Sequence, residues 1–104
     1  MALGLQISKE LTGEIFTVKL VGELNVKTSP TLESEIKNSL DGVKELILDF
    51  SEVKYISSSG LRVLLAMEKA MRRQGGKMTL LHVNSDVKEI IKLAGFLQVM
   101  HIED

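Results

Sequence analysis

Cysteine is absent from the 104-residue sequence, and long apolar runs are absent as well. Without cysteine the chain can form neither a disulfide framework nor a thiolate metal site, which is typical of proteins in a reducing compartment. No stretch approaches the roughly 18 uninterrupted apolar residues of a membrane-spanning helix, and the first ten residues lack the basic and apolar segments of a signal peptide. We therefore expect a cytoplasmic protein that does not insert into a membrane.

An excess of positive charge is also missing. Thirteen basic and fourteen acidic side chains give a formal net charge of -1, so no strong positive field is available to hold a nucleic-acid backbone or an anionic membrane. Nucleic acid is therefore not an expected partner. With 44% hydrophobic residues, the chain has the size of one compact domain, and residues 1–104 are predicted to form it.

The sequence offers little for catalysis. Three consecutive serines, 57–59, are the most conspicuous hydroxyls, but a serine nucleophile needs a base within hydrogen-bond reach. The only histidines, His82 and His101, fall in predicted strands and not in loops that point toward the serines. The glycine that opens a G-x-S-x-G elbow is missing too. We predict no catalytic residues and no enzymatic activity.

Metal and cofactor sites are not indicated either. Two separated histidines and scattered carboxylates show no ligand spacing. The glycine pair 75–76 lacks the spacing of a phosphate-binding loop and is explained by the end of a helix. We therefore expect no metal and no cofactor.

Alternating apolar residues predict two strands near the N-terminus. The segments 3–8 and 14–24 have period-two patterning, and Phe16, Val18 and Leu20 share one face of the second strand. Gly13 between them favours a tight turn. The simplest arrangement is an antiparallel hairpin.

A helical period follows. Leu32, Ile36 and Leu40 recur every four residues, with Ser29 as the candidate N-cap and Pro30, the only proline, at the first helical position. The pair 41–42, Asp-Gly, ends this helix. The short apolar run 44–50 then predicts a strand that is covered on both faces.

The second half of the chain repeats the alternation of helix and strand. The patterning predicts a helix over 58–73, a strand over 77–83, a helix over 85–95 capped by Ser85, and a last strand over 97–102. The element order is β-β-α-β-α-β-α-β, which predicts an α/β fold with a mixed sheet. The carboxyl ends of the second and third strands, residues 22–25 and 55–59, should meet at one edge, where open α/β sheets place their sites.

Capping explains only part of the serine triplet. One hydroxyl at the start of the 58–73 helix can accept a backbone N–H, which accounts for one serine. Gly60 opens the backbone at the same turn, and exposed hydroxyls at the positive end of a helix dipole would also receive a phosphate well. Spacing alone leaves capping and modification open.

Several segments resemble a known family. The stretch "LILDFSEVKYISSSGLRVLL" resembles the signature of the STAS domain, the fold of anti-sigma factor antagonists, in which a strand and a loop lead to a D-S-[SA]-G-L turn. "VGELN" is similar to the family's G-E-[LI]-D element, and "GGKMTLLHVNSDVKEIIKLAGF" to its helix-stop, strand and third-helix segment. The resemblance covers nearly the whole chain and implies a STAS-like fold.

The resemblance also implies a function. In the family, the serine after the aspartate is phosphorylated by a partner that is both anti-sigma factor and serine-protein kinase, and a PP2C-type phosphatase removes the phosphate. By position this serine is Ser58, which leaves Ser59 as the expected helix cap. The unphosphorylated form would bind the partner and so regulate sigma-factor-dependent transcription. The implied partner-binding residues are Glu23, Leu24, Asn25, Thr28, Ser57, Ser59, Gly60 and Leu61.

Two positions depart from the family pattern. Ser57 and Asn25 stand where the family usually has aspartate. These changes leave open whether Ser58 is phosphorylated, and they give a second reading: an accessory STAS subunit of a transporter or signalling complex that binds without phosphorylation. A small-ligand or nucleotide binder is a third reading, against which the absence of a basic or aromatic lining near the serines counts.

Overall fold

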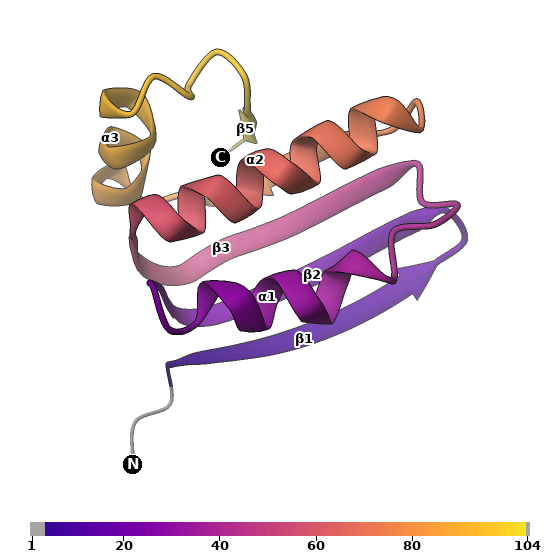
Figure 1. The fold of residues 1–104 in the computed structure, drawn as a ribbon, viewed down its shortest axis with the longest axis horizontal. Coiled ribbons are helices and arrows are strands. Elements are labelled where there is room, and N and C mark those ends of the chain that lie inside the picture. The colour runs from indigo at the N-terminus through magenta and orange to yellow at the C-terminus, as the bar shows by residue number, and fades with distance from the viewer. Residues whose placement is uncertain (1–3, 104) are drawn as a thin grey trace.

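Five strands and three helices form the structure, a computed structural model that describes residues 4–103. The element order is β-β-α-β-α-β-α-β, which confirms the predicted α/β fold (Figure 1). The elements are β1 (Leu5–Thr12), β2 (Ile15–Leu24), α1 (Ser29–Lys37), β3 (Glu45–Ile56), α2 (Ser58–Arg73), β4 (Lys77–Leu81), α3 (Ser85–Leu93) and β5 (His101–Glu103).

The strands lie in the sheet in sequence order, β1-β2-β3-β4-β5. β1 is antiparallel to β2, and every later neighbouring pair is parallel. Gly13, with φ 63°, and Glu14 turn the chain between Thr12 and Ile15, which face each other across the hairpin. The predicted mixed sheet and its N-terminal antiparallel hairpin are confirmed. Residue 3 of the predicted first strand lies outside the described residues.

One face of the sheet carries the core. The alternating apolar residues of β2 and β3 are buried there, and α1 and α2 lie side by side across this face (Figure 1). On the opposite face, Ile47 and Asp49 of β3 are only half-buried. The prediction that this strand is covered on both faces is therefore wrong. The buried residues that line the covered face are Phe16, Val18, Leu20, Leu46, Leu48 and Phe50.

β3 is longer than the sequence pattern predicts, ending at Ile56 instead of residue 50. Its register against β2 shifts twice, between Lys19 and Val21 and between Gly22 and Glu23. Each shift places an extra β3 residue opposite the shorter β2 segment, as in a β-bulge. The bulges return Val53 and Ile56 to the buried face, so the strand continues through a polar stretch.

The helix caps also differ from the prediction. Thr28, not Ser29, is the N-cap of α1, and Asn84, not Ser85, is the N-cap of α3. The Asn84 Oδ1 accepts the Val87 N–H at 2.8 Å, while its Nδ2 donates to the Val53 carbonyl at 2.8 Å, so this cap also ties α3 to β3. Both helices end before the predicted residues, at Lys37 and Leu93.

β4 ends earlier than predicted, and β5 begins later than predicted. β4 stops at Leu81 because His82 has a positive φ of 59°, which a strand residue does not adopt. β5 begins only at His101, because the Phe96 carbonyl accepts the N–H groups of Val99 and Met100 in a turn. His82 therefore lies outside the strand in which it was predicted, whereas His101 lies in β5.

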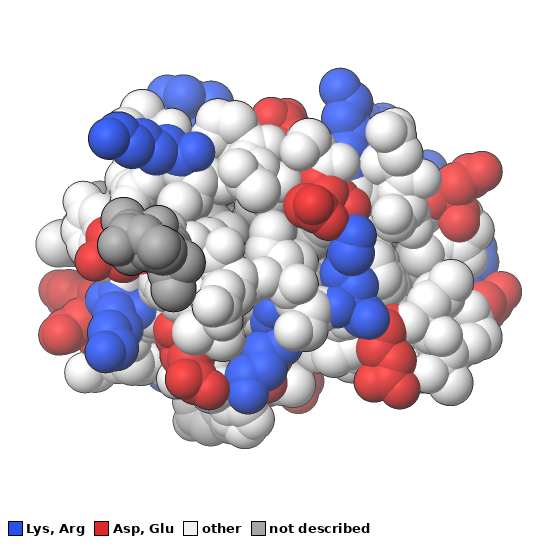
Figure 2. Space-filling view, turned by 90° about the horizontal axis from the view of Figure 1, so that it is seen from below, with Lys and Arg blue, Asp and Glu red and all other residues white. Residues whose placement is uncertain are grey.

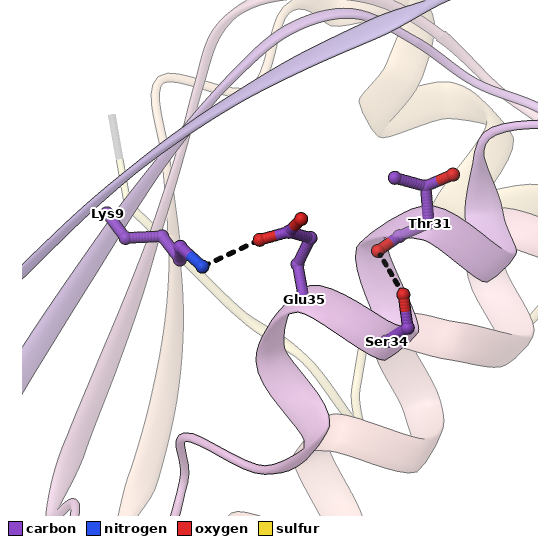
Figure 3. Close-up of polar contacts among 4 residues, drawn as sticks. All are labelled: Lys9, Thr31, Ser34 and Glu35. Atoms are coloured by element: carbon purple, nitrogen blue, oxygen red, sulfur yellow. Dashed lines mark hydrogen bonds and ion pairs between the residues drawn. The ribbon is translucent and has the colours of Figure 1, made fainter.

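Surface charges are of mixed sign. Figure 2 shows basic and acidic side chains interspersed over one side of the molecule, without a large area of either sign. One such pair, Lys9 Nζ and Glu35 Oε1 at 2.6 Å, joins β1 to α1 (Figure 3). Within residues 4–103, no helix is both long and apolar enough to cross a membrane.

Candidate functional site

Two turns meet at the carboxyl edge of the sheet. Leu24 at the end of β2 pairs with Ile56 at the end of β3, and the Ser57 N–H donates to the Leu24 carbonyl at 2.7 Å. The predicted meeting of these two strand ends is confirmed. The chain between β2 and α1, residues 25–28, and the start of α2 therefore form one continuous surface, which we call the switch edge.

The serine triplet divides into three different environments. Ser57 is the N-cap of α2: its backbone is extended, with φ -95° and ψ 176°, and its Oγ accepts the Gly60 N–H at 3.3 Å. The prediction that Ser59 is the cap is therefore wrong. Ser58 is the first helical residue and is exposed, and Ser59 is half-buried. Since Ser57 fulfils the capping role, the hydroxyl of Ser58 remains available to a partner.

Gly60 sets how closely α2 approaches the sheet. A Cβ at this position would lie 2.8 Å from Ile56 Cγ1 and 3.0 Å from Leu24 Cβ, both closer than normal packing allows. Only glycine fits here without a shift of the neighbouring chain. The Leu61 N–H then donates to the Ser57 carbonyl at 2.9 Å, and the Leu61 side chain is buried.

Asn25 organises the turn before α1. Its Oδ1 accepts the N–H groups of Lys27 at 2.9 Å and Thr28 at 3.0 Å, and its own N–H donates to Thr28 Oγ1 at 2.8 Å. The Thr28 hydroxyl in turn donates to the Glu23 carbonyl at 2.7 Å. Asn25 and Thr28 therefore hold the backbone of the turn, and Ser29 adds a bond from its Oγ to the Asn25 carbonyl at 2.6 Å.

The two departures from the family pattern have the same structural role. Each uses a side-chain oxygen to accept backbone N–H groups: Asn25 in the turn that precedes α1, and Ser57 in the first turn of α2. A carboxylate could accept the same bonds, and so can the neutral amide and hydroxyl oxygens. Neither turn therefore needs a negative charge to keep its shape.

The predicted partner-binding residues, together with the predicted phosphorylation site Ser58, fall into three groups by exposure. Glu23 and Ser58 are exposed, so they are accessible to a partner. The half-buried Asn25, Ser57 and Ser59 contribute part of their surface. The remaining four are buried and shape the turns from below: Leu24, Thr28, Gly60 and Leu61.

Sequence reasoning missed three surface residues at this edge. Val26 is 69% exposed at the tip of the first turn, Tyr55 is 45% exposed beside Glu23, and Arg62 is exposed in α2. An apolar residue within a polar turn and a charge within the apolar run "GLRVLL" are the signals that could have found Val26 and Arg62.

Two grooves flank the start of α2. One lies between α1 and α2, and its walls include Val26, Ser59, Arg62 and Val63. The other lies between α2 and the chain that follows α3, and its lining comprises Ser58, Leu61, Arg62, Leu65, Ala94 and Phe96. The switch edge therefore offers apolar walls on both sides of a polar helix start.

The histidines have other neighbours. His101 Nε2 lies 2.7 Å from Glu103 Oε2 in β5. His82 is close enough to Asp49 for their charges to interact. Among residues 4–103, no hydrogen bond or ion pair joins either ring to the serine triplet, and no group of three His, Asp or Glu side chains could hold a metal ion.

Asp49, in β3, has a shifted pKa. Burial raises the pKa of this carboxyl, but hydrogen bonds from Ser51 and the nearby charges of His82 and Lys19 outweigh burial and hold the pKa below its ordinary value. The Ser51 N–H donates to Asp49 Oδ1 at 2.9 Å. This cluster lies on the sheet away from the switch edge.

Comparison with known sequences finds one family. The family model of the STAS domain matches residues 6–104. A protein from Bordetella bronchiseptica named as a candidate anti-sigma factor antagonist, BtrV, is 33% identical over 84 residues, which are 80% of this chain and 72% of that protein. The anti-sigma F factor antagonist of Paenibacillus polymyxa is 28% identical and covers 98% of this chain and 89% of its own.

Comparison with solved structures finds the same fold. The anti-sigma factor antagonist SpoIIAA in its unphosphorylated form superposes with a TM-score of 0.81 at 21% identity, covering 93% of this chain and 87% of that one. The Bacillus cell fate determinant SpoIIAA in its phosphorylated form superposes with a TM-score of 0.74 at 20% identity, covering 93% and 90%.

Proposed function

The chain belongs to the STAS domain family, and from this membership we propose that it acts as an anti-sigma factor antagonist, a regulatory binding protein and not an enzyme. Its partner would be an anti-sigma factor that is also a serine-protein kinase. Binding of the unphosphorylated antagonist through the switch edge would free the sigma factor, and phosphorylation of Ser58 would end the binding.

The observation that carries this proposal is the position of Ser58. It is an exposed hydroxyl at the first residue of α2, and the Ser57–Leu24 hydrogen bond holds it beside the turn that contains Asn25. Ser57 already caps the helix, so Ser58 has no structural task that phosphorylation would disturb. The neighbouring exposed Glu23 and Val26 extend the surface that a partner would contact.

The phosphorylation step needs chemistry that the partner supplies. The Ser58 Oγ attacks the γ-phosphorus of ATP, an O–P bond forms, the bond to the β-phosphate oxygen breaks, and ADP leaves. The hydroxyl proton passes to a base of the kinase, which also holds ATP and magnesium. A PP2C-type phosphatase would reverse the modification by hydrolysis, returning the Ser58 hydroxyl and inorganic phosphate.

A phosphate on Ser58 would block binding without refolding the chain. It adds a charge of about -1.5 to -2 and three acceptor oxygens at the centre of the switch edge. The positive end of α2 tolerates this charge, so the fold need not change. A partner surface that fits the neutral hydroxyl would clash with the larger phosphate. Binding would also remove water from the charged phosphate, which costs free energy.

The test uses a serine-protein kinase that acts as an anti-sigma factor in the same organism. The chain is incubated with that kinase and ATP, the added phosphate is located by mass spectrometry, and affinity for the kinase is measured for Ser58→Ala and Ser58→Asp. We expect phosphate on Ser58, ATP-resistant binding by Ser58→Ala, and at least tenfold weaker binding by Ser58→Asp. Ser85→Ala is the matched control, because Ser85 is the exposed first residue of α3.

Two outcomes contradict this proposal. Phosphate on any residue other than Ser58 defeats the site assignment, and equal affinity of Ser58→Ala and Ser58→Asp defeats the electrostatic switch. The neutral side chains at positions 25 and 57 favour a second candidate, an accessory STAS subunit that binds permanently. A complex from cells that neither phosphatase treatment nor Ser58→Asp disrupts would support that candidate.

A further inference from the structure

Arg62 lies one helical turn after Ser58. It interrupts the apolar run of α2, where Leu61, Val63 and Leu64 on either side of it are buried, and its own side chain is exposed. Arg62 borders both grooves beside the start of α2, one together with Ser58 and the other together with Ser59. It is therefore the charged side chain shared by the two surfaces that meet at the serines.

The guanidinium of Arg62 has no partner among the described residues. No hydrogen bond or ion pair within residues 4–103 involves it, although Glu33 of α1 lines the same groove. Arg72 of the same helix differs, because its Nη2 lies 2.7 Å from Glu68 Oε2. Arg62 therefore has its full hydrogen-bonding capacity available to a new anion.

Helix geometry places the Arg62 side chain on the same face of α2 as Ser58. Residues four apart lie on the same helix face with Cβ atoms about 5–6 Å apart, and helical side chains lean toward the N-terminus. The long Arg62 side chain thus leans toward position 58. A guanidinium binds phosphate oxygens through two parallel N–H···O bonds, which are short and strong.

We propose that Arg62 holds the phosphate of phosphorylated Ser58 within the chain. This inference rests on the proposed phosphorylation and specifies how the modified state is organised. The phosphate is fixed over the first turn of α2, between the two grooves, and does not extend freely into solvent. The same ion pair occupies the guanidinium, which in the unmodified protein is open to an acidic group of a partner.

The test measures the second pKa of the phosphate and needs no kinase. Phosphoserine is installed at position 58 during translation, in the otherwise native chain and in chains carrying Arg62→Gln, Arg62→Lys or Arg73→Gln, and each is titrated by phosphorus NMR. The helix terminus is the same in all four proteins, so its effect cancels. Arg73→Gln is the matched control, because it removes the same charge from an exposed arginine at the other end of α2.

We expect the phosphate pKa to lie about 0.5 unit higher in Arg62→Gln than in the native chain, because an opposite charge nearby favours the doubly ionised form. Arg73→Gln should match the native chain, and Arg62→Lys should lie between the native chain and Arg62→Gln. The difference should shrink with added salt, since both groups are exposed.

An unchanged pKa in Arg62→Gln, or an equal rise in Arg62→Gln and Arg73→Gln, would overturn the proposal. The first result would mean that the phosphate does not contact Arg62, and the second that only overall charge matters. Because the phosphoserine is installed directly, the titration is decisive even if the kinase experiment fails. A failed kinase experiment would refute the proposed function and not this ion pair.

Discussion

The polar residues of the switch edge act mainly on the backbone. Ser57, Asn25 and Thr28 each bond main-chain groups, whereas Ser58 and Arg62 have free polar atoms at the surface of the described structure. This division separates residues that shape the turns from residues that a partner or a phosphate can use. It also predicts different costs for substitutions that look alike in the sequence.

Ser57 and Ser59 should respond differently to alanine. Ser57→Ala removes the N-cap of α2 and should lower the free energy of unfolding by about 1 kcal/mol. Ser57→Asp keeps the acceptor and adds a charge favoured at a helix N-terminus, so stability should be kept or slightly raised. Ser59→Ala should change stability by less than about 0.5 kcal/mol. Urea unfolding measures all three, and equal losses for Ser57→Ala and Ser59→Ala would disprove the assignment of the cap.

The free energy of unfolding should fall in acid partly because Asp49 becomes protonated. Its pKa is lowered in the folded chain relative to an unfolded value of about 3.9, so its contribution is present above that pH and is lost as the pH falls through the folded pKa. In Asp49→Asn this contribution is gone, so the loss of stability as the pH falls below about 3.9 should be smaller than in the native chain. Asp41→Asn, in the turn after α1, is the control. If the free energy of unfolding of Asp49→Asn falls in acid as steeply as that of the native chain, this carboxyl does not stabilise the fold in this way.

At the scale of elements, the start of α2 depends on the end of β2 as much as on β3. Gly60 lies against Leu24 and Ile56, and Ser57 bonds the Leu24 carbonyl. Two segments that are separate in the sequence, the end of β2 and the junction of β3 with α2, therefore fix one helix end. A change that pushes α2 outward would alter both turns of the switch edge together.

Gly60→Ala tests this coupling. Alanine gains about 1 kcal/mol in helix propensity, but the overpacking against Leu24 and Ile56 should cost about 1–3 kcal/mol, so the net effect should be a loss of stability. The loss should come with chemical-shift changes at Asn25 and Thr28, across the shared edge. Ser59→Ala, which adds no atom, is the control. A stabilised Gly60→Ala with unchanged signals at Asn25 would show that the close approach is unimportant.

The sequence patterns predicted the helices and strands themselves more accurately than the residues at which they end. The order of strands and helices and the range 58–73 of α2 were predicted because period and turn signals are local. The end of β3 was missed because its bulges break the alternation at Ser51 and Glu52, which resembles a loop. The prediction of Ser59 as the cap is wrong because it followed from assigning Ser58 to phosphorylation, whereas the extension of β3 to Ile56 makes Ser57 the cap.

At the scale of the whole molecule, the exposed residues of the switch edge lie outside the core. The core lies between the sheet and the pair α1 and α2, whereas α2 begins at the edge where β2 and β3 end (Figure 1). The side chains that hold the fold together, such as Leu64, do not reach the surface. Charge added at this edge should therefore change what the protein binds without changing how it folds.

Ser58→Asp and Leu64→Ala should show this separation. Ser58→Asp should keep the free energy of unfolding within about 0.5 kcal/mol of the native value, because its side chain is exposed. Leu64→Ala should cost about 2–5 kcal/mol, because its side chain is completely buried. Thermal and urea unfolding give both values. A large loss in Ser58→Asp would mean that the modification works by unfolding and not at the surface.

The hydrogen bond from Ser57 to Leu24 has a consequence for protein synthesis. The bond joins the ends of two strands that are far apart in the sequence, so it can form only when the ends of β2 and β3 lie side by side. A nascent chain that has left the ribosome only as far as α1 carries Asn25 but not the partner turn. Incomplete or unfolded copies therefore present no complete surface, and the level of signal would follow the number of folded molecules and not the number translated.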